Sequence, residues 1–324
     1  MMSKMIDVKS TAEFLLDNDN FLILMHANPD GDTIGGGFAL HFALRRLGKK
    51  SRVLCADEFS KKFDYIIKNY SDDEQFDIAT VVAVDVADEK LLGELQGVYG
   101  GKIKLCIDHH RTNKMYAEMT YVNSNSAAVC ECIYEILQQM GVLIDSLIAN
   151  CLYTGLATDT GCFKFSNTTP KTHIYAAELM TLGAEYGEIN RIHFEVKSQG
   201  RLKIEKEVLK NIEFYFEGKC AVITVTQTMI NQTGCDMGDI DGITAMSRQI
   251  EGVFVGVTIR EKPNGNFKVS IRTFDPYNAA EICSVFGGGG HTNAAGCEFS
   301  CTLEETKQSV LSEVNRVIEQ QVSK

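Results

Sequence analysis

The sequence lacks any apolar run of the roughly 18 to 20 residues that a membrane-spanning helix needs. It also lacks the apolar core of a secretion signal, because its first ten residues read M-M-S-K-M-I-D-V-K-S. With 44% hydrophobic and 23% charged residues, its composition is that of an ordinary globular protein. We therefore expect a cytoplasmic protein with no membrane partner.

An excess of positive charge is also missing, since the formal net charge is −11. Proteins that grip long nucleic acids neutralise many phosphates with a basic surface, and no basic stretch of that kind is visible in the sequence. Long duplex nucleic acid is therefore not an expected partner. Any phosphate ligand is expected to be small and to be held locally by metal ions, glycine loops and one or two arginines.

The 11 cysteines lack the spacing of a structural zinc site. Cys130 and Cys132 are separated by one residue rather than two, and in a helical pattern residues two apart do not share a face. Most other cysteines lie inside apolar runs, and their number is odd. We interpret them as buried, reduced thiols rather than as disulfides or metal ligands.

Short apolar runs alternate with helical patterns through the first part of the chain. Strands are expected at 21–26, 51–55, 79–85 and 103–107, and helices at 33–47, 126–140, 144–157 and 171–183. Continuous apolar strands that alternate with helices are typical of a parallel sheet with helices on both faces. The sequence therefore predicts an α/β domain over residues 1–190.

The pattern changes after residue 190, and the length of 324 residues leaves room for a second domain. The charged segment 191–210 is expected to form a linker helix. Beyond it, strand patterns at 211–226, 253–260 and 267–274 are mixed with helical patterns at 239–250, 278–285 and 303–322. We predict a smaller α+β domain with a mixed sheet over residues 211–324, with a cleft between the two domains.

Four short stretches end in clustered aspartates and histidines. They are H-A-N-P-D-G-D from His26 to Asp32, V-A-V-D ending at Asp85, D-H-H at 108–110, and A-T-D-T-G around Asp159. The first three follow strand-like runs, and the ligands of parallel sheets collect at the carboxyl ends of the strands. These polar side chains are therefore expected to lie close together.

The residue types in these stretches favour a site for two divalent cations. The negative charges of four aspartates would balance two such ions: Asp30, Asp32, Asp85 and Asp159. With His26 and His109 added, the shell contains oxygen and imidazole but no thiolate, which favours Mn²⁺, Mg²⁺ or Co²⁺ over structural zinc. We expect Mn²⁺ first among these.

Two such ions, about 3.5–4 Å apart, could share a hydroxide that attacks phosphorus and could stabilise the charge that develops there. A carboxylate must bridge the ions, and Asp85 is the candidate. The pattern therefore predicts a hydrolase that acts on phosphoester bonds.

These motifs resemble those of the DHH phosphoesterase superfamily. The run G-G-G-G-H-T-N-A-A-G at 287–296 resembles the glycine-rich signature of its DHH-associated C-terminal domain. The run T-D-T-G-C-F-K-F-S-N-T-T-P at 158–170 is similar to that of the bacterial nanoRNase and pAp-phosphatase branch, where pAp is 3′-phosphoadenosine 5′-phosphate. The resemblance covers nearly the whole chain. One departure is Gly36, where the family often has serine, and it concerns helix packing rather than the ligands.

The resemblance implies a division of the metal ligands between the two ions. One ion would be held by His26 and Asp30, the other by Asp32, His109 and Asp159, and Asp85 would be shared. His110 would lie beside the scissile phosphate and donate a hydrogen bond or a proton. Asp108 would not bind a metal ion itself but would orient the two histidines.

Candidate substrate contacts lie mainly in the second domain. The backbone N–H groups of Gly288, Gly289 and Gly290 can face an anion, and His291 can donate to a phosphate. Arg272 is the candidate for a bidentate phosphate clamp, and Arg111 is a further candidate beside D-H-H. Two alternatives stay open here, namely that the glycines form only a flexible turn and that Arg272 is an ordinary surface residue.

The expected function is hydrolysis of short oligoribonucleotides, of the 3′-phosphate of pAp, or of both. An alternative within the superfamily is a phosphodiesterase for cyclic di-AMP or for a linear dinucleotide. A single-strand DNA exonuclease would be expected to carry further domains and a more basic surface. A non-catalytic nucleotide-binding regulator would be expected to lose a ligand, and all six are present. Homodimers are common among such proteins, so a homodimer is among the expected states.

Overall fold

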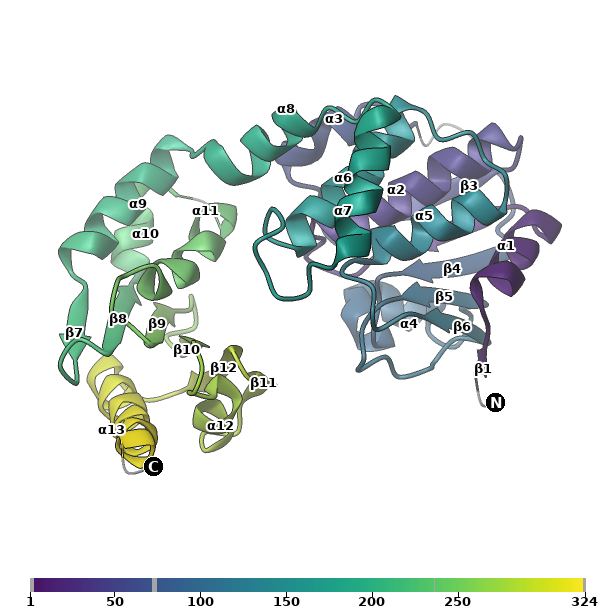
Figure 1. Cartoon of the computed structure of the whole chain (residues 1–324). Coiled ribbons are helices and arrows are strands. Elements are labelled where there is room, and N and C mark those ends of the chain that lie inside the picture. The colour runs from purple at the N-terminus through teal and green to yellow at the C-terminus, as the bar shows by residue number, and fades with distance from the viewer. Residues whose placement is uncertain (1–2, 72–74, 236, 323–324) are drawn as a thin grey trace. The chain divides into compact units, whose positions relative to one another are not determined.

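The structure is a computed structural model that describes residues 3–71, 75–235 and 237–322 (Figure 1). The chain divides into two compact units, residues 1–196 and 197–324, and each has its own sheet and core. None of the helices in the described ranges combines the length and the apolar character that crossing a bilayer requires. All 11 cysteines are free thiols and most are buried, in agreement with their interpretation as reduced thiols.

The first unit contains a parallel six-stranded sheet, as predicted. Its strands are β1 (Lys4–Met5), β2 (Phe21–Leu24), β3 (Ser51–Leu54), β4 (Thr80–Val84), β5 (Leu105–Asp108) and β6 (Met119–Val122), in the order β1-β6-β5-β4-β2-β3. The chain runs from β2 to β3 on one side and then to β4 on the other side of β2. This reversal of strand order lies between β2 and β4, where an open α/β sheet forms its ligand crevice.

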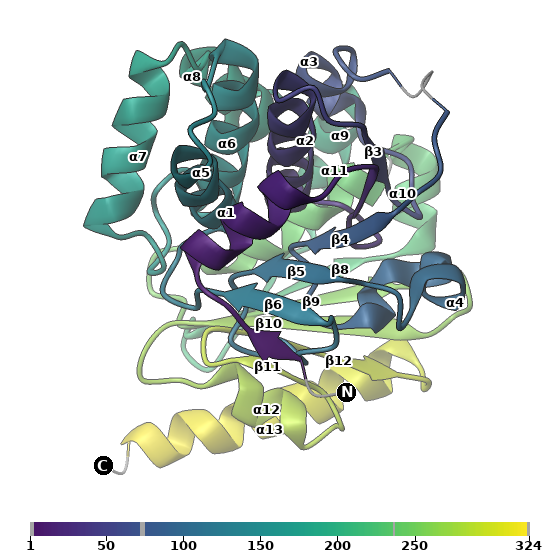
Figure 2. The same ribbon diagram turned by 90° about the vertical axis from the view of Figure 1, so that its right-hand side faces the viewer.

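Helical segments cover both faces of this sheet (Figure 2). One face packs against α1 (Val8–Asp17), α2 (Gly31–Arg46), α5 (Val129–Gln139) and α6 (Ser146–Asp159), with α7 (Pro170–Thr181) beside α6. The other face packs against the 3₁₀ segment Glu89–Leu95 and α4 (Gln96–Tyr99). The remaining helical segments are the 3₁₀ turn Lys61–Phe63, α3 (Asp64–Ile67), α8 (Tyr186–Asn190) and the π-helical turn Arg191–Glu195.

Glycines let α2 approach its neighbours closely. A Cβ atom on Gly35 would lie 2.4 Å from the carbonyl oxygen of Cys151 in α6, so no larger residue fits there without a shift. Gly36 packs against Val84 and Val129, whose Cγ1 atoms would lie 3.0 and 2.9 Å from an added Cβ. Gly36, where the family often has serine, therefore affects how α2 packs against β4 and α5.

The second unit is a smaller α+β fold with a mixed sheet, as predicted. Its strands are β7 (Glu213–Tyr215), β8 (Cys220–Val225), β9 (Val255–Glu261), β10 (Phe267–Thr273), β11 (Gly289–His291) and β12 (Ala294–Phe299), in the order β11-β12-β10-β9-β8-β7. Among the described residues of this unit, only β8 and β9 pair in parallel. One face packs against α12 (Ala279–Ser284) and α13 (Leu303–Val322).

The opposite face of the second sheet is covered over only part of its width. The covering segments are α9 (Gln199–Lys210), α10 (Gln227–Thr233), α11 (Met237–Asp241) and the 3₁₀ segment Gly242–Arg248. Ile204 and Val208 of α9 are buried against β8. The charged segment 191–210 is therefore divided: its first residues form the π-helical turn of the first unit, and α9 is part of the core of the second.

Candidate metal centre

The carboxyl ends of β2, β4 and β5 bring three of the sequence motifs together, because these strands are neighbours in the sheet. His26 follows β2, Asp85 follows β4 directly, and Asp108 is the last residue of β5. Asp159 is the last residue of α6, and Asp32 lies in the first turn of α2. The four motifs therefore converge at the strand-order reversal.

Three groups of potential ligand atoms form there, and within each group all atoms lie within 4.8 Å of one another. They are His26, Asp30 and Asp85; Asp32, His109 and Asp159; and Asp85, His109 and His110. The first two groups coincide with the residue sets that the family resemblance implies for the two ions, and Asp85 of the first group lies 3.6 Å from His109 of the second. That these residues bind metal remains a prediction.

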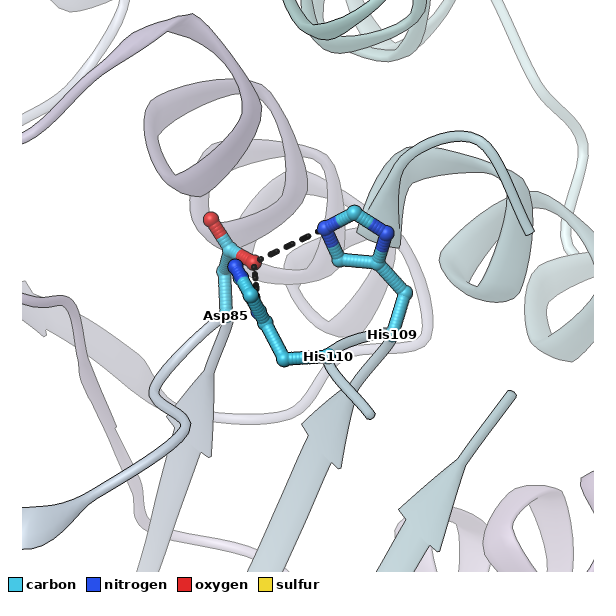
Figure 3. A group of neighbouring side chains, drawn as sticks. All are labelled: Asp85, His109 and His110. Atoms are coloured by element: carbon cyan, nitrogen blue, oxygen red, sulfur yellow. Dashed lines mark ion pairs between the residues drawn. The ribbon is translucent and has the colours of Figure 1, made fainter. Parts of the chain in front are cut away.

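Asp85 directs its two carboxylate oxygens toward different histidines. Its Oδ2 lies 3.7 Å from Nε2 of His26, whereas its Oδ1 lies 3.6 Å from Nε2 of His109 and 3.5 Å from Nδ1 of His110 (Figure 3). These separations exceed the usual hydrogen-bond range. Two ligands bound about 2.1 Å from one cation lie roughly 3–3.5 Å apart, so the spacing fits shared ions better than direct contacts.

The environment of Asp85 also fits a bridging ligand. The residue is 3% exposed, and among the described residues nothing hydrogen-bonds to its Oδ1. Its backbone φ of 61° lies in the left-handed region, which costs a non-glycine residue about 1–3 kcal/mol. A buried carboxylate oxygen without a partner, held on strained backbone, is expected where a cation completes the site.

Two histidines are held in the orientation that metal binding needs. Nδ1 of His26 lies 2.8 Å from the carbonyl oxygen of Ala27, and Nδ1 of His109 lies 3.2 Å from that of Ser126. A proton on each Nδ1 donates to these carbonyls, which leaves the lone pair of Nε2 directed toward the aspartates. Both rings can therefore act as neutral Nε2 ligands.

Backbone N–H groups of two different helices hold the carboxylates of Asp30 and Asp32. Asp30 caps α2, because its Oδ1 accepts hydrogen bonds from the N–H groups of Asp32 (3.0 Å) and Thr33 (3.1 Å). Asp32 is 1% exposed and accepts from the N–H groups of Val129 (2.6 Å) and Cys130 (3.1 Å) at the start of α5. Both carboxylates thus reach the site in fixed positions.

The carboxylates strongly perturb one another in the absence of a cation. Burial, reinforced by repulsion from neighbouring aspartates, raises the pKa values of Asp32 and Asp159 to about 7 and that of Asp85 well above its usual value. Burial alone would lower the pKa of His26, but contact with Asp30 and Asp85 raises it to about 11. Divalent cations would supply the positive charge that this cluster lacks.

His110 is held differently from the other two histidines. Its Nδ1 lies 2.7 Å from Oδ1 of Asp108, which also accepts from the N–H groups of His109 (2.7 Å) and His110 (3.2 Å). The hydrogen bond to Asp108 is the main reason that the pKa of His110 is raised to about 9. The side chain is 44% exposed, so this ring is a protonated, accessible donor at neutral pH.

Asn113 was missed in the sequence, and it completes the support of His110. Its Nδ2 donates to Oδ2 of Asp108 at 2.6 Å, so both oxygens of this buried carboxylate are engaged. Asn167 has a comparable place beside Asp159, with its Nδ2 at 3.4 Å from Oδ2 and 3.2 Å from the main-chain oxygen. Asn113 belongs to no periodic pattern or motif, so no local signal identifies it, whereas Asn167 lies inside the run 158–170 that carries the family resemblance.

The predicted substrate residues are only partly brought together. Arg272 and Gly289 line one pocket of about 660 Å³ in the second unit, whereas Gly288, Gly290 and His291 are not among its lining residues. The glycine run forms the turn after α12 and then strand β11 rather than a free loop. Arg111, in the first unit, is exposed.

Gly288 has a structural role in that turn. Its N–H donates to the carbonyl oxygen of Cys283 at 3.0 Å, and a Cβ atom would lie 2.3 Å from the oxygen of Gly296. Arg272 is half-buried, and among the described residues its side chain hydrogen-bonds only to the carbonyl oxygen of Ile271, at 3.2 Å. Its guanidinium therefore keeps donors available for an anion.

Comparison with known proteins places these observations in a family. A family model described as the DHH family, N-terminal domain, matches residues 20–156, and one described as the DHHA1 domain matches residues 217–320. A bifunctional oligoribonuclease and PAP phosphatase, NrnA, of Thermus thermophilus is 33% identical over 296 residues, which cover 90% of this chain and 88% of that protein. The protein of the same name from Bacillus subtilis is 25% identical over 283 residues, which cover 86% and 88%.

A solved structure shares the fold. The crystal structure of an exopolyphosphatase-related protein from Bacteroides fragilis matches with a TM-score of 0.85 and 23% sequence identity over 95% of both chains. At this identity the likeness concerns the architecture of the chain alone.

Proposed function

This chain belongs to the DHH family and carries a DHHA1 domain, and from that premise we propose that it hydrolyses short oligoribonucleotides and the 3′-phosphate of pAp with the help of two divalent cations. Its reaction class, hydrolysis of phosphoester bonds, is that of the family. The observation that carries the proposal is a pair of neighbouring ligand groups. Asp85 belongs to the group with His26 and Asp30, and its Oδ1 lies 3.6 Å from Nε2 of His109 in the other group.

The ligand groups account for both cations. His26 and Asp30 would hold one ion, Asp32, His109 and Asp159 the other, and Asp85 would bridge them. When bound, two such ions supply a hydroxide nucleophile at neutral pH and offset negative charge on the phosphoryl oxygens. The shell of carboxylates and imidazoles favours Mn²⁺, with Mg²⁺ and Co²⁺ as alternatives.

His110 would donate a proton to the leaving oxygen. The hydrogen bond from its Nδ1 to Asp108 directs Nε2 away from the buried carboxylate, and the raised pKa keeps the ring protonated at neutral pH. A positioned general acid of this kind contributes about 10²- to 10⁴-fold to the rate. Asp108 holds the ring without contacting substrate, and Asn113 fixes Asp108 in turn.

The second unit would recognise a phosphate of the substrate. Arg272 and Gly289 line the same pocket, and a guanidinium without a carboxylate partner can form a bidentate contact with a phosphate. Oligoribonuclease and PAP phosphatase activity is what the names of the relatives from Thermus thermophilus and Bacillus subtilis state, and both substrates carry phosphates close to a chain end.

A panel of substrates tests this proposal. The purified protein is incubated with Mn²⁺ and, in parallel, with pApA, a five-nucleotide RNA, a long RNA, pAp, cyclic di-AMP and pyrophosphate. We expect turnover of the short RNAs and of pAp, and much slower turnover of the other three. Cleavage of cyclic di-AMP as fast as that of pApA would instead assign a cyclic dinucleotide as substrate, and no turnover of any member would contradict the proposal.

A further inference from the structure

One short segment of the first unit supports all three residues that would hold one of the two ions. The segment comprises residues 126–130, leads into the first turn of α5 and is buried throughout. We call it the α5 entry segment. Its backbone groups contact Asp32 and His109 directly, and they contact Asp159 through one asparagine. The positions of these ligands therefore depend on the position of the segment.

Two carbonyl oxygens of the α5 entry segment face ligand residues. The oxygen of Ser126 lies 3.2 Å from Nδ1 of His109. The oxygen of Ala127 accepts from Nδ2 of Asn167 at 2.9 Å, and the same Nδ2 lies 3.2 Å from the main-chain oxygen of Asp159. Displacement of these carbonyl groups would disturb the contacts that orient two of the ligands.

The N–H groups at the end of the segment bind the third ligand. Alanine is a poor N-cap, and Ala128, the N-cap of α5, makes no side-chain capping hydrogen bond. The carboxylate of Asp32 takes that role from α2, because it accepts from the N–H groups of Val129 at 2.6 Å and Cys130 at 3.1 Å. The position of Asp32 is thus tied to the start of α5.

Glu131, the next residue, fastens the segment to α7. It is 1% exposed, its Oε2 accepts from the N–H group of Ala127 at 3.3 Å, and its Oε1 accepts from Oγ1 of Thr172 at 2.5 Å. Among the described residues it forms no ion pair, and Lys171 at the start of α7 pairs with Glu135 instead. A buried carboxylate without a cation lowers stability, so its presence points to a task that an apolar residue could not perform.

The loop that follows Asp159 is held at two points by the same contacts. This loop leads from α6 to α7, and Asn167 lies in it. Asn167 binds the carbonyl group of Ala127, and the first turn of α7 is joined to Glu131 through Thr172. The two hydrogen bonds of Glu131 therefore connect the two backbone pieces between which Asn167 lies.

The residues that would hold the other ion have separate supports. Nδ1 of His26 lies 2.8 Å from the carbonyl oxygen of Ala27. Asp30 caps α2 by accepting from the N–H groups of Asp32 and Thr33. None of these contacts involves the α5 entry segment. Loosening of the segment would therefore act on one ion without acting directly on the other.

We propose that Glu131 is a positioning residue for the ion that Asp32, His109 and Asp159 would bind. It would touch neither the ion nor the substrate, and it holds the α5 entry segment in the geometry in which these three ligands meet. The inference rests on the proposed function, because that function requires the ion. Loss of Glu131 should weaken one cation site and spare the other, which loss of an ordinary structural contact would not do.

The test compares variants of Glu131 with a matched control. Glu131→Met keeps the size of the side chain but removes both acceptors, whereas Glu131→Gln can still accept from Ala127 and donate to Thr172. Thr172→Val breaks the same link from α7 and replaces Glu131→Met if that variant does not fold. Tyr134→Phe is the control, because its hydroxyl donates to Oε2 of Glu178 at 2.7 Å and also joins α5 to α7, which lie side by side (Figure 2).

The main readout is the affinity of each site for Mn²⁺, measured from the electron paramagnetic resonance signal of free Mn²⁺. Each Glu131 or control variant is combined with His26→Ala, which leaves the ligands of one ion, and with Asp159→Ala, which leaves those of the other. A readout without metal is the amide hydrogen exchange of Val129 and Cys130 in chelator. Thermal melting in chelator checks that every variant folds.

We expect Glu131→Met to weaken Mn²⁺ binding about 10- to 100-fold with His26→Ala, the usual effect of losing a residue that supports a ligand. With Asp159→Ala, the affinity should change by less than about twofold, as for independent sites. Glu131→Met should also speed exchange at Val129 and Cys130, and Glu131→Gln should restore both properties. Tyr134→Phe should lower the melting temperature and leave Mn²⁺ binding unchanged.

The outcomes separate this inference from the proposed function. If wild type binds two Mn²⁺ ions and Glu131→Met binds both equally well, the inference is overturned and the function stands. Equal losses at both sites, or the same loss in Tyr134→Phe, would make Glu131 an ordinary structural residue and overturn the inference as well. A selective loss in Glu131→Met, in a protein that turns over no member of the substrate panel, would support the inference and contradict the function. A wild type that binds no Mn²⁺ would overturn both.

Discussion

Oδ1 of Asp85 lies 3.6 Å from Nε2 of His109, and among the described residues this buried oxygen has no hydrogen-bond partner. The gap is too wide for a direct hydrogen bond and suits a cation between the two atoms. The other oxygen of the carboxylate, Oδ2, lies 3.7 Å from Nε2 of His26. The carboxylate is therefore placed between the group of His26 and Asp30 and the group that contains His109.

Replacing Asp85 by asparagine should abolish activity and yet stabilise the metal-free protein. The amide keeps the shape of the carboxyl group but removes a negative charge that burial and Asp32 disfavour. We expect kcat to fall by about 10³-fold or more if the bridge between the ions is lost, while the melting temperature in chelator rises. Asp77→Asn, an exposed aspartate, is the control. Retained turnover would remove Asp85 from the bridging role.

His110→Asn should lower kcat by about 10²- to 10⁴-fold, the range for a lost general acid, while Mn²⁺ still binds. In wild type, kcat should fall as pH rises through the pKa of His110, because the deprotonated ring cannot donate. Asp108→Asn removes the main cause of the raised pKa, so the alkaline limb should move to lower pH. A limb at the same pH in Asp108→Asn would contradict the assignment of His110.

Mn²⁺ should raise the melting temperature more at pH 8.5 than at pH 6. The pKa values of His26, Asp32 and Asp159 are raised in the metal-free fold, so in this window the folded state holds more protons than the unfolded chain. The stability of the metal-free protein therefore falls as pH rises. Bound cations replace these protons, and the apparent affinity for metal can grow by up to about tenfold per pH unit for each proton displaced. Melting curves with Mn²⁺ and with chelator measure the difference, and a shift that shrinks with pH would count against this account.

Gly288→Ala and Gly289→Ala form a matched pair. A Cβ at residue 288 would lie 2.3 Å from the oxygen of Gly296, whereas at residue 289 nothing lies within 4 Å. We expect the first change to cost about 1–3 kcal/mol of stability, as overpacking does, and the second to cost little. Since Gly289 lines the pocket, its substitution should instead raise KM. Denaturant unfolding measures the stability of the two variants, and steady-state kinetics measure their KM. Equal stability of the two variants would refute the packing argument.

Arg272→Ala should act mainly on KM. The guanidinium has no carboxylate partner among the described residues, so its removal should leave the fold intact and eliminate binding of a phosphate that does not react. Loss of such uniform binding raises KM and leaves kcat nearly unchanged. We expect a rise of about 10- to 100-fold, the range of one or two charge-assisted hydrogen bonds. An unchanged KM would make Arg272 an ordinary surface residue.

The strands that carry the ligand motifs were predictable because their signal is local. The apolar runs at 21–26, 79–85 and 103–107 become β2, β4 and β5, and no end differs by more than two residues. The long amphipathic pattern at 303–322 coincides with α13. In these segments the hydrophobic period and the tertiary burial agree, so the pattern alone is enough.

Other elements depend on long-range pairing and leave little local trace. Strand β1 has only two residues, both exposed, and exists because it pairs with β6 about 115 residues later in the chain. The helical pattern at 239–250 becomes the short α11 and a 3₁₀ segment instead of one helix. The order of strands in the sheet, which decides that β4 lies beside β2, follows from the packing of the whole unit.

The residues of the candidate site also fall into those that the sequence predicts and those that only the structure shows. Residue types and strand ends predicted that these side chains lie close together, and the family resemblance predicted their division into groups. The supporting Asn113 follows Asp108 in an irregular loop, and no pattern reveals it. Along β10, Lys268 and Arg272 alternate with buried neighbours at a period of two. Only the strand register shows that Lys268 lies opposite Arg260 of β9.

The central claim, a pair of cations bridged by Asp85, is tested most directly by anomalous diffraction from crystals soaked in Mn²⁺. Two peaks about 3.5–4 Å apart, one beside His26 and Asp30 and the other beside Asp32, His109 and Asp159, are the predicted result. A site that binds no manganese at saturating concentration, or a single ion that leaves Asp85 unbound, would contradict it.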